Sequence, residues 1–277
     1  MQEKYDLAVA YRIYPKISSF PAKFSNDKYK LSEFCLKSFK KSLGKLKVKM
    51  FVLLDNCPPE YEELFLKYFD YEDLEFIRLD GIGNLPTFRL QIEILLKQKL
   101  SEIIYFAEDD YFYLSEQFPE MIEFLNENSD ADFVSPYDHL DLYTSHIHNY
   151  ESIIKISKNR HWRTAGSICL TFLTTKKTLQ KTHETFQSYS EGNTDWGMWL
   201  SLTNDGLNHS KILIKSLKSP GNIKNLIRSF KTNKNQILHG KTWKLWVPIP
   251  AIATHMEKTC LSPAMDWEKL MNENIDE

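Results

Sequence analysis

Glycine and cysteine are scarce in this chain of 277 residues, which contains nine glycines and four cysteines. The cysteines are far apart and form no C-x-x-C pair: Cys35, Cys57, Cys169 and Cys260. This spacing argues against a zinc site and against a disulfide framework, and it favours reduced thiols in a cytosolic protein. The loop expected after the first strand, residues 11–20, has no glycine, so it does not read as a glycine-rich phosphate loop.

Long apolar runs and a dominant positive charge are missing too. No apolar stretch approaches the ~20 residues that a membrane-spanning helix needs, and the N-terminus lacks a signal-peptide pattern. We therefore expect a cytoplasmic protein, with peripheral contact at the inner face of the cytoplasmic membrane left open. The net charge is -2, and residues 51–150 hold 22 Asp/Glu against 5 Lys/Arg. A nucleic-acid partner is disfavoured, because it would need a basic face over most of the fold.

The hydrophobic pattern that is present alternates short strands with amphipathic helices. Strands are expected at Tyr5–Tyr14, Val48–Leu54, Leu74–Leu79 and from Ile103, with helices between them at Lys28–Leu43, 60–69 and Thr87–Leu100. This order predicts an α/β fold, with a Rossmann-like, mostly parallel sheet flanked by helices. The second half is less regular, with strands expected at Ala131–Tyr137, Ile168–Leu173 and Val247–Thr254.

The stretch Ile103–Tyr113, IIYFAEDDYFY, carries the strongest functional signal. Its apolar strand runs directly into Glu108, Asp109 and Asp110, three adjoining acids that are hard to desolvate without a cation. Acids at positions i and i+2 of an extended segment point the same way, so Glu108 and Asp110 are expected to bind Mn²⁺ or Mg²⁺ together. Asp109 would point elsewhere, toward a ribose or a backbone donor. The alternative is a solvated acidic turn.

Two further acids follow strand ends, Asp55 after the second strand and Asp80 after the third. The carboxyl ends of parallel strands share one edge of the sheet, which is where ligands bind in open α/β folds. Each of these acids taken alone is typical of a turn or a helix cap.

Together these residues resemble the GT-A glycosyltransferases, and within them the bacterial family 2-like nucleotide-sugar enzymes. In that family a D-x-D-type motif after the fourth strand holds Mn²⁺ or Mg²⁺ on the diphosphate of a nucleotide-sugar, and here the motif reads E-D-D. The resemblance covers roughly residues 5–200. It implies one GT-A-like catalytic domain over 1–277, in which 1–130 is the nucleotide-sugar half and 131–277 the acceptor half.

The activity that the resemblance implies is metal-dependent transfer from a nucleotide-sugar, with a UDP-sugar expected, to a glycan or lipid-linked acceptor. Its setting would be the synthesis of a bacterial surface polysaccharide, such as lipopolysaccharide or capsule. Carried over by position, the donor-binding residues would be Ala10, Tyr11, Arg12, Asp55, Asp80, Asn84, Arg89, Glu108 and Asp109. The chain lacks the family's D-G-S or D-x-S turn after the second strand, where Asp55 stands.

Further residues carry over from the second half of the family pattern. Asp195, in T-D-W, resembles the carboxylate that deprotonates the acceptor hydroxyl, which would make the transfer inverting; Thr194 or Asp195 could instead cap a helix. His255, in T-H-M-E, resembles a late histidine that completes the metal shell. The acceptor site would involve Trp162, Arg163 and Trp196, with a place in the core as the alternative for Trp196.

The segment 211–246 holds nine Lys/Arg and no Asp/Glu. Three interpretations stay open for it: a lid over the diphosphate, a contact with an anionic membrane or a lipid-diphosphate acceptor, and a solvated basic surface.

Two other functions remain to be separated from glycosyl transfer. A sugar nucleotidyltransferase would have a G-x-G-x-R loop with a lysine after the first strand, and Tyr11–Phe20 contains no glycine. A non-catalytic protein that binds nucleotides or glycans on the same fold would tolerate loss of Asp195.

Overall fold

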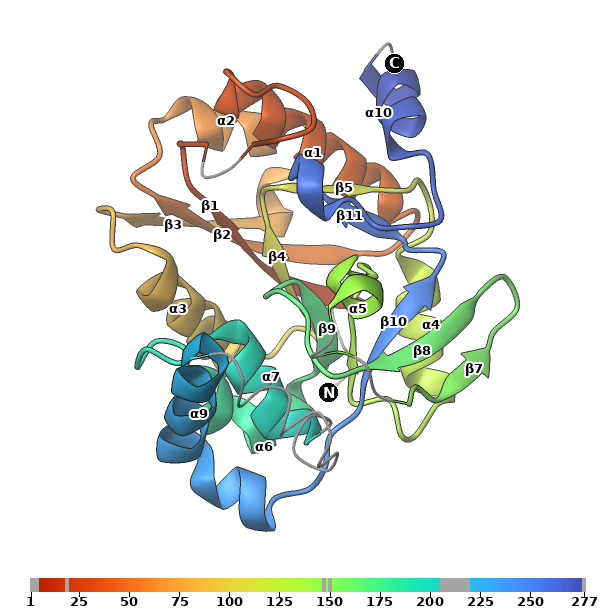
Figure 1. Ribbon diagram of the computed structural model, residues 1–277. Helices are drawn as coiled ribbons and strands as arrows, with labels where there is room; N and C mark the ends of the chain where they lie inside the picture. The colour runs from red at the N-terminus through yellow and green to blue at the C-terminus, as the bar shows by residue number, and fades with distance from the viewer. Residues whose placement is uncertain (1–4, 18–19, 146–147, 149–150, 205–219, 276–277) are drawn as a thin grey trace.

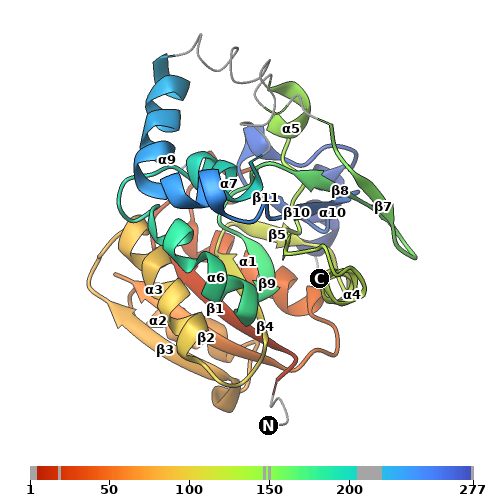
Figure 2. The same ribbon diagram turned by 90° about the horizontal axis from the view of Figure 1, so that it is seen from below.

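The computed structural model describes residues 5–17, 20–145, 148, 151–204 and 220–275. These residues form a nine-stranded sheet in the order β3-β2-β1-β4-β9-β6-β10-β8-β7 and a two-stranded sheet of β11 and β5. The bounds of the large sheet are β3 (Leu74–Leu79), β2 (Val48–Asp55), β1 (Leu7–Ile13), β4 (Ile103–Glu108), β9 (Phe172–Thr175), β6 (Phe133–Val134), β10 (Leu245–Ile249), β8 (His161–Ala165) and β7 (Ile154–Ile156). Helices cover both faces of the sheet (Figures 1 and 2).

The first half of the sheet is parallel, as the sequence predicts. β1 pairs in parallel with both β2 and β4, and β2 pairs in parallel with β3. The crossovers contain α1 (Lys28–Ser42), α2 (Glu60–Leu66), a 3-10 turn η1 (Tyr71–Asp73) and α3 (Asn84–Lys97). The α/β fold with a Rossmann-like sheet is therefore confirmed. β9 pairs antiparallel with β4 and begins the less regular second half.

Two hydrophobic layers sandwich the sheet. One packs under α1, α2 and α4 (Pro119–Glu127), and the other under α3, α6 (Lys176–Gln187) and α7 (Asp195–Thr203). Along β1, Tyr11 belongs to the first layer and Ala10 to the second, because side chains of a strand alternate between its faces. Both side chains are buried, so neither meets a nucleotide as predicted. Of the expected trio, only Arg12 reaches the end of the strand.

Several predicted boundaries move. α3 begins at Asn84 rather than near Thr87, because Pro86 is tolerated in the first turn of a helix. The strand expected at Ile168–Leu173 begins only at Phe172, and the preceding residues form a loop. The strand expected at Ala131–Tyr137 shortens to β6.

The small sheet joins two distant parts of the chain. β5 (Tyr111–Tyr113) pairs antiparallel with β11 (Ala253–His255), and Tyr111 lies opposite His255. This register brings His255 beside Asp110. The chain continues through a 3-10 turn, η3 (Lys258–Cys260), to α10 (Trp267–Ile275), which packs back through Trp267 against Phe112 at 6.3 Å between rings.

The remaining described helices are α5 (Asp141–Thr144) and α9 (Pro220–His239). In Figure 2 both lie on the side of the molecule at the top of the view. Among the described residues, none of the helices is long and apolar enough to cross a membrane.

Candidate active site

A cleft of about 390 Å³ opens at the carboxyl ends of β1 to β4. Its walls come from four strand ends and the start of α1, and they include Arg12, Tyr14, Lys16, Lys28, Asp55, Asn84, Glu108, Asp109 and Asp110. The predicted gathering of acids at this edge holds for Asp55 and for the three acids after β4. Asp80 and Arg89 are not among the lining residues.

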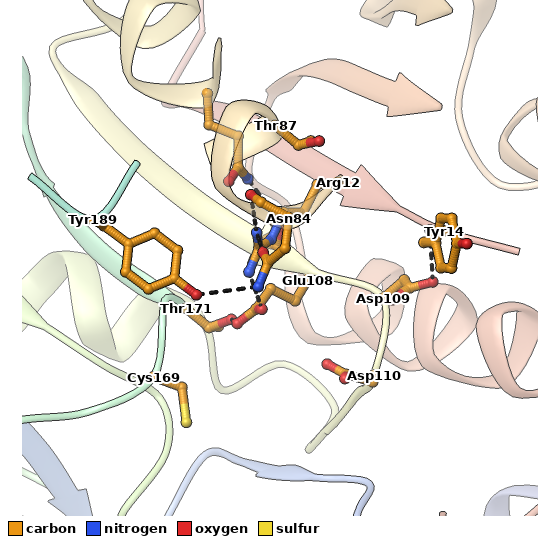
Figure 3. A network of polar contacts seen from close by, with 12 residues as sticks. Arg12, Tyr14, Asn84, Thr87, Glu108, Asp109, Asp110, Cys169, Thr171 and Tyr189 are labelled. Atoms are coloured by element: carbon orange, nitrogen blue, oxygen red, sulfur yellow. Dashed lines mark hydrogen bonds and ion pairs between the residues drawn. The ribbon is translucent and has the colours of Figure 1, made fainter. Parts of the chain in front are cut away.

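Glu108 is held by its neighbours in the fold. One carboxylate oxygen accepts from the Arg12 guanidinium and the other accepts from Thr171 Oγ1 at 2.8 Å. Arg12 also bonds the side chain of Asn84, whose Nδ2 donates to the Tyr189 hydroxyl at 3.1 Å (Figure 3). This chain of bonds ties β1, α3, β4 and the residues after α6 together at the cleft floor.

Both carboxylate oxygens of Glu108 are therefore engaged by protein groups, and its pairing with Asp110 on one metal stays a prediction. β4 ends at Glu108, and residues 109 and 110 form a turn before β5, so the i, i+2 rule for an extended segment does not apply. In the described part of the chain, no group of three or more His, Cys, Asp or Glu side chains is arranged to bind a metal ion.

Asp109 points away from Asp110, as expected for the middle acid. It is buried and accepts from Lys28 Nζ at 2.7 Å, from Ser32 Oγ at 3.3 Å and from the backbone N–H of Tyr14 at 3.4 Å. Lys28 is the first residue of α1, and so this pair fixes the start of that helix against the turn after β4.

Asp110 is the acid best suited to a metal. Its Oδ2 lies 3.3 Å from His255 Nε2, while its buried Oδ1 has no hydrogen-bond partner. Burial alone would raise the pKa of Asp110, but His255, Lys28 and Arg12 hold it at about 2. The carboxylate is thus ionised at neutral pH, with one oxygen left to bind a cation.

These residues fit a Mn²⁺ or Mg²⁺ ion shared with a substrate. Mg²⁺ commonly binds through one or two carboxylates plus substrate phosphates and waters, and Mn²⁺ also accepts imidazole. His255 Nδ1 lies 3.1 Å from the backbone N–H of Glu257, so the ring proton that faces Asp110 is on Nε2. Burial alone would lower the pKa of His255, but Asp110 raises it to about 9. His255 would bind the metal only after giving up that proton.

Asp55 holds a loop. Its two oxygens accept the backbone N–H groups of Ile82 and Gly83 at 2.8 and 2.9 Å, and the residue is only 3% exposed. Gly83 has a φ of 85°, in the region that favours glycine. Both oxygens that were predicted to read a base edge are already engaged, so Asp55 shapes the cleft wall that leads to Asn84.

Alanine in place of Asp55 is expected to lower the free energy of unfolding by about 1–3 kcal/mol, because two backbone donors lose their acceptors. Urea titration measures this, and nucleotide binding should weaken at the same time. Asp80→Ala is the matched control, since Asp80 is exposed and outside the cleft. Equal stability of the two variants would contradict the role given to Asp55.

Asp80 and Arg89 correct two predictions. Asp80 is exposed on the turn after β3. Arg89 lies on the solvent face of α3, with Nε 3.4 Å from Glu93, because Phe88 and Gln91 occupy the buried face of that helix. Neither of the two reaches the expected donor site.

A second cavity, of about 160 Å³, lies between α5 and the start of α7. Asp195 and Trp196 line it, together with His139, Ser167 and Cys169. The cap of α7 is Thr194, whose Oγ1 accepts the N–H of Gly197 at 3.0 Å. Asp195 is therefore not needed as a cap and is available to the cavity. Its Oδ1 accepts the N–H of Trp196 at 2.7 Å, and burial raises its pKa.

Trp162 and Arg163 do not line this cavity. Trp162 is completely buried and stacks on Phe124 at 4.3 Å between rings, so it belongs to the core. Arg163 pairs with Asp138 at 2.8 Å and lies 4.2 Å above the ring of Tyr143. Strand alternation in β8 explains why one side chain faces the core and its neighbour does not.

The structure adds residues that the sequence did not single out. His139 lines the second cavity, and its Nδ1 accepts the N–H of Asp141 at 2.9 Å, so its Nε2 carries the proton. Burial lowers the pKa of His139 and favours the neutral ring. Lys28 could have been noticed as a cation at a helix start on the carboxyl edge, whereas no local pattern marks His139 or Thr171.

The two cavities adjoin at the end of β4. Thr171, which bonds Glu108 in the first cavity, is two residues from Cys169, which lines the second (Figure 3). The negative charge of Glu108 also contributes to the raised pKa of Asp195. The pKa of Asp110 in the first cavity is thus lowered, and the pKa of Asp195 in the second cavity is raised by burial.

No protein-family model matches the chain, and no curated protein matches it. Similar solved structures include the mannosyltransferase PcManGT from Pyrobaculum calidifontis in complex with GDP-Man and Mn²⁺, at 11% identity and a TM-score of 0.40. That alignment covers 65% of this chain and 47% of the mannosyltransferase, so the match spans about half of that protein.

Two other similar structures are a transferase and a synthase. The galactosyltransferase LgtC with donor and acceptor sugar analogues matches at 10% identity and a TM-score of 0.41, over 70% of this chain and 69% of its own. A 4-diphosphocytidyl-2C-methyl-D-erythritol synthase from Anaerococcus prevotii matches at 11% identity and a TM-score of 0.42, over 73% and 85%. At such identities neither reaction nor substrate follows from these matches, and both have to be argued from this chain's own residues.

Proposed function

We propose that the protein is a metal-dependent glycosyltransferase that moves a sugar from a nucleotide-sugar to a hydroxyl group of a glycan or lipid-linked acceptor. One observation carries this proposal: the cleft at the carboxyl edge of the sheet contains Asp110, whose Oδ1 has no hydrogen-bond partner, and a second cavity nearby contains Asp195, which is not the cap of its helix. The lowered pKa of Asp110 and the raised pKa of Asp195 agree with separate roles for these two acids. Asp110 is suited to bind a cation, and Asp195 is suited to accept a proton.

The first cavity is assigned to the nucleotide-sugar. Lys16 and Lys28 line it and can offset the charge of a diphosphate, while the loop held by Asp55 forms the wall for the nucleoside. Asp110, with His255 beside it, would hold Mn²⁺ or Mg²⁺, which supplies charge neutralisation to the departing diphosphate. Arg12 and Glu108 keep the cleft floor in place through their mutual ion pair.

The second cavity is assigned to the acceptor. Asp195 takes the proton of the acceptor hydroxyl as its oxygen attacks the anomeric carbon of the donor sugar, and the bond from that carbon to the diphosphate breaks. Attack from the face opposite the leaving group inverts the anomeric configuration. Trp196 offers a partly exposed ring for a sugar, and the Nε2–H of His139 is a donor for a second hydroxyl.

The finer assignments rest on the family resemblance. They are a UDP-sugar as donor, a nucleotide-sugar half over 1–130, an acceptor half over 131–277, and a role in bacterial surface polysaccharide synthesis at the inner face of the cytoplasmic membrane. The predicted lid over the diphosphate comprises residues 211–246, of which 211–219 lie outside the described residues and 220–239 form α9.

Release of free nucleoside diphosphate, measured over a panel of nucleotide-sugars with Mn²⁺ and a mixture of acceptor glycans, tests the proposal. A glycosyltransferase releases nucleoside diphosphate from one class of donor, and the release is faster when an acceptor is present. Sugar nucleotidyl transfer is the alternative that the two lysines of the cleft also suit, and it would release pyrophosphate from a nucleoside triphosphate and a sugar phosphate. Pyrophosphate release alone would overturn the proposal.

A further inference from the structure

Helix α9 turns one polar face inward. Ser229 and Asn233 are buried against α7 and the residues before it, where Ser229 Oγ donates to Asn193 Oδ1 at 3.4 Å and Asn233 Nδ2 donates to Ser201 Oγ at 3.2 Å. Leu226 is buried on the same side. These contacts fix the helix on α7, the helix that begins at Asp195, and determine which face points outward.

The outward face combines apolar and cationic side chains. Ile227 is 62% exposed and Phe230 is 39% exposed, three residues apart and therefore neighbours on the helix surface. Lys224, Arg228 and Lys231 are exposed around them. Cations beside exposed apolar residues on one helix are typical of a helix that lies in a membrane interface.

The charge of this face has no counterpart nearby. The segment from Lys211 to Trp246 contains no acid, and the three cations form no ion pair with any described residue. A merely solvated basic surface would not need exposed Ile227 and Phe230, and burying them in an uncharged protein partner would leave the cations without compensation. An anionic lipid surface satisfies both groups.

The face also lies close to the acceptor cavity. α5 contributes Asp141 and Leu142 to that cavity and α7 contributes Asp195 and Trp196, while α9 packs directly on α7. In Figure 2, α9 and α5 lie on the same side of the molecule. A surface touched by α9 would therefore lie on the side of the molecule where α5 helps to form the acceptor cavity.

We propose that the outward face of α9, formed by Lys224, Ile227, Arg228, Phe230 and Lys231, docks on an anionic lipid bilayer. Ile227 and Phe230 enter the interface, and the three cations pair with lipid phosphates. The functional role of this docking rests on the proposed function, because docking would bring a lipid-linked acceptor to the second cavity.

Sedimentation with vesicles tests this without any turnover. The protein should bind vesicles of phosphatidylcholine mixed with phosphatidylglycerol at least about tenfold more tightly than phosphatidylcholine alone, and high salt should weaken that binding. Ile227→Asp and Arg228→Glu, each at an exposed position that leaves the fold intact, should both reduce it. Circular dichroism of each variant checks the fold.

Matched controls carry the same changes elsewhere on the surface. Leu66→Asp, at a 45% exposed position of α2, and Lys45→Glu should bind like the wild type. Equal binding to both kinds of vesicle, or binding unaffected by the α9 variants, would overturn the proposal. A concentration-dependent dimer that Ile227→Asp disrupts would also overturn it, in favour of a second copy of the chain. Because no donor or acceptor is present, failure here leaves the proposed transferase untouched.

Discussion

Asparagine in place of Asp195 is expected to lower kcat of sugar transfer by about 10²–10⁴-fold and to leave the Kd of nucleoside diphosphate with Mn²⁺ unchanged. Asparagine keeps the oxygen that accepts the Trp196 N–H and has nearly the same volume, but it cannot take a proton from the acceptor. Steady-state kinetics and titration calorimetry measure the two quantities. Asp195→Ala should likewise keep nucleotide binding while transfer is lost.

Asp141→Asn provides the control from the same cavity, because Asp141 lines it at the opposite side and has no assigned proton transfer. It is expected to change KM for the acceptor more than kcat. Equal losses of kcat in the two variants would show that negative charge in the cavity matters, and not a base at Asp195. Nucleotide binding with full transfer in Asp195→Asn would remove Asp195 from the mechanism.

The pH dependence follows from the same residue. A base must be deprotonated, so kcat/KM falls as the pH drops through the pKa of Asp195. Burial raises that pKa, and the acid limb should therefore lie above the ordinary aspartate value of about 3.9. In Asp195→Asn the limb should disappear from the residual activity. A wild-type limb at the ordinary value would contradict the burial argument.

Asparagine in place of Asp110 is expected to abolish the stabilisation that Mn²⁺ and nucleotide give together. The neutral amide cannot supply the anionic oxygen that the buried Oδ1 offers. In the wild type, ligand at a hundredfold excess over Kd adds about 2.7 kcal/mol, or roughly 5 °C in Tm for a chain of this size. The variant should lose nearly all of that increment.

Asp109→Asn separates metal binding from stability. Breaking the buried pair with Lys28 should cost about 3–5 kcal/mol and lower Tm without ligand. The metal-dependent increment should nevertheless persist, because Asp110 is intact. Persistence of the increment in Asp110→Asn, or its loss in Asp109→Asn alone, would reverse the roles given to the two acids.

The order of elements and the position of the carboxyl edge follow from periodicity. Short continuous apolar runs with amphipathic helices between them predicted β1 to β4 and α1 to α3, and acids after strand ends predicted where a cleft would open. Asp195 was singled out because T-D-W resembles the later acidic motif of the glycosyltransferase family. These signals are local, and the sequence carries them directly.

The contacts within the site depend on packing that no local pattern encodes. A two-residue turn at 109 and 110 separated Glu108 from Asp110, and the loop at Ile82 and Gly83 took both oxygens of Asp55. His139, just before α5, lines the second cavity although it is far from Asp195 in the sequence. Trp162 was predicted to line a sugar site because it stands beside an arginine. Its position in the alternation of β8 instead places its side chain in the core.

The most direct test of the central claim is a thermal-shift panel of UDP-, GDP-, CMP- and dTDP-sugars, each with and without Mn²⁺, on the wild type and on Asp110→Asn. We expect a rise in Tm with one class of nucleotide-sugar, with UDP-sugars expected, only when Mn²⁺ is present and only in the wild type. No metal-dependent rise with any of the four would contradict the claim.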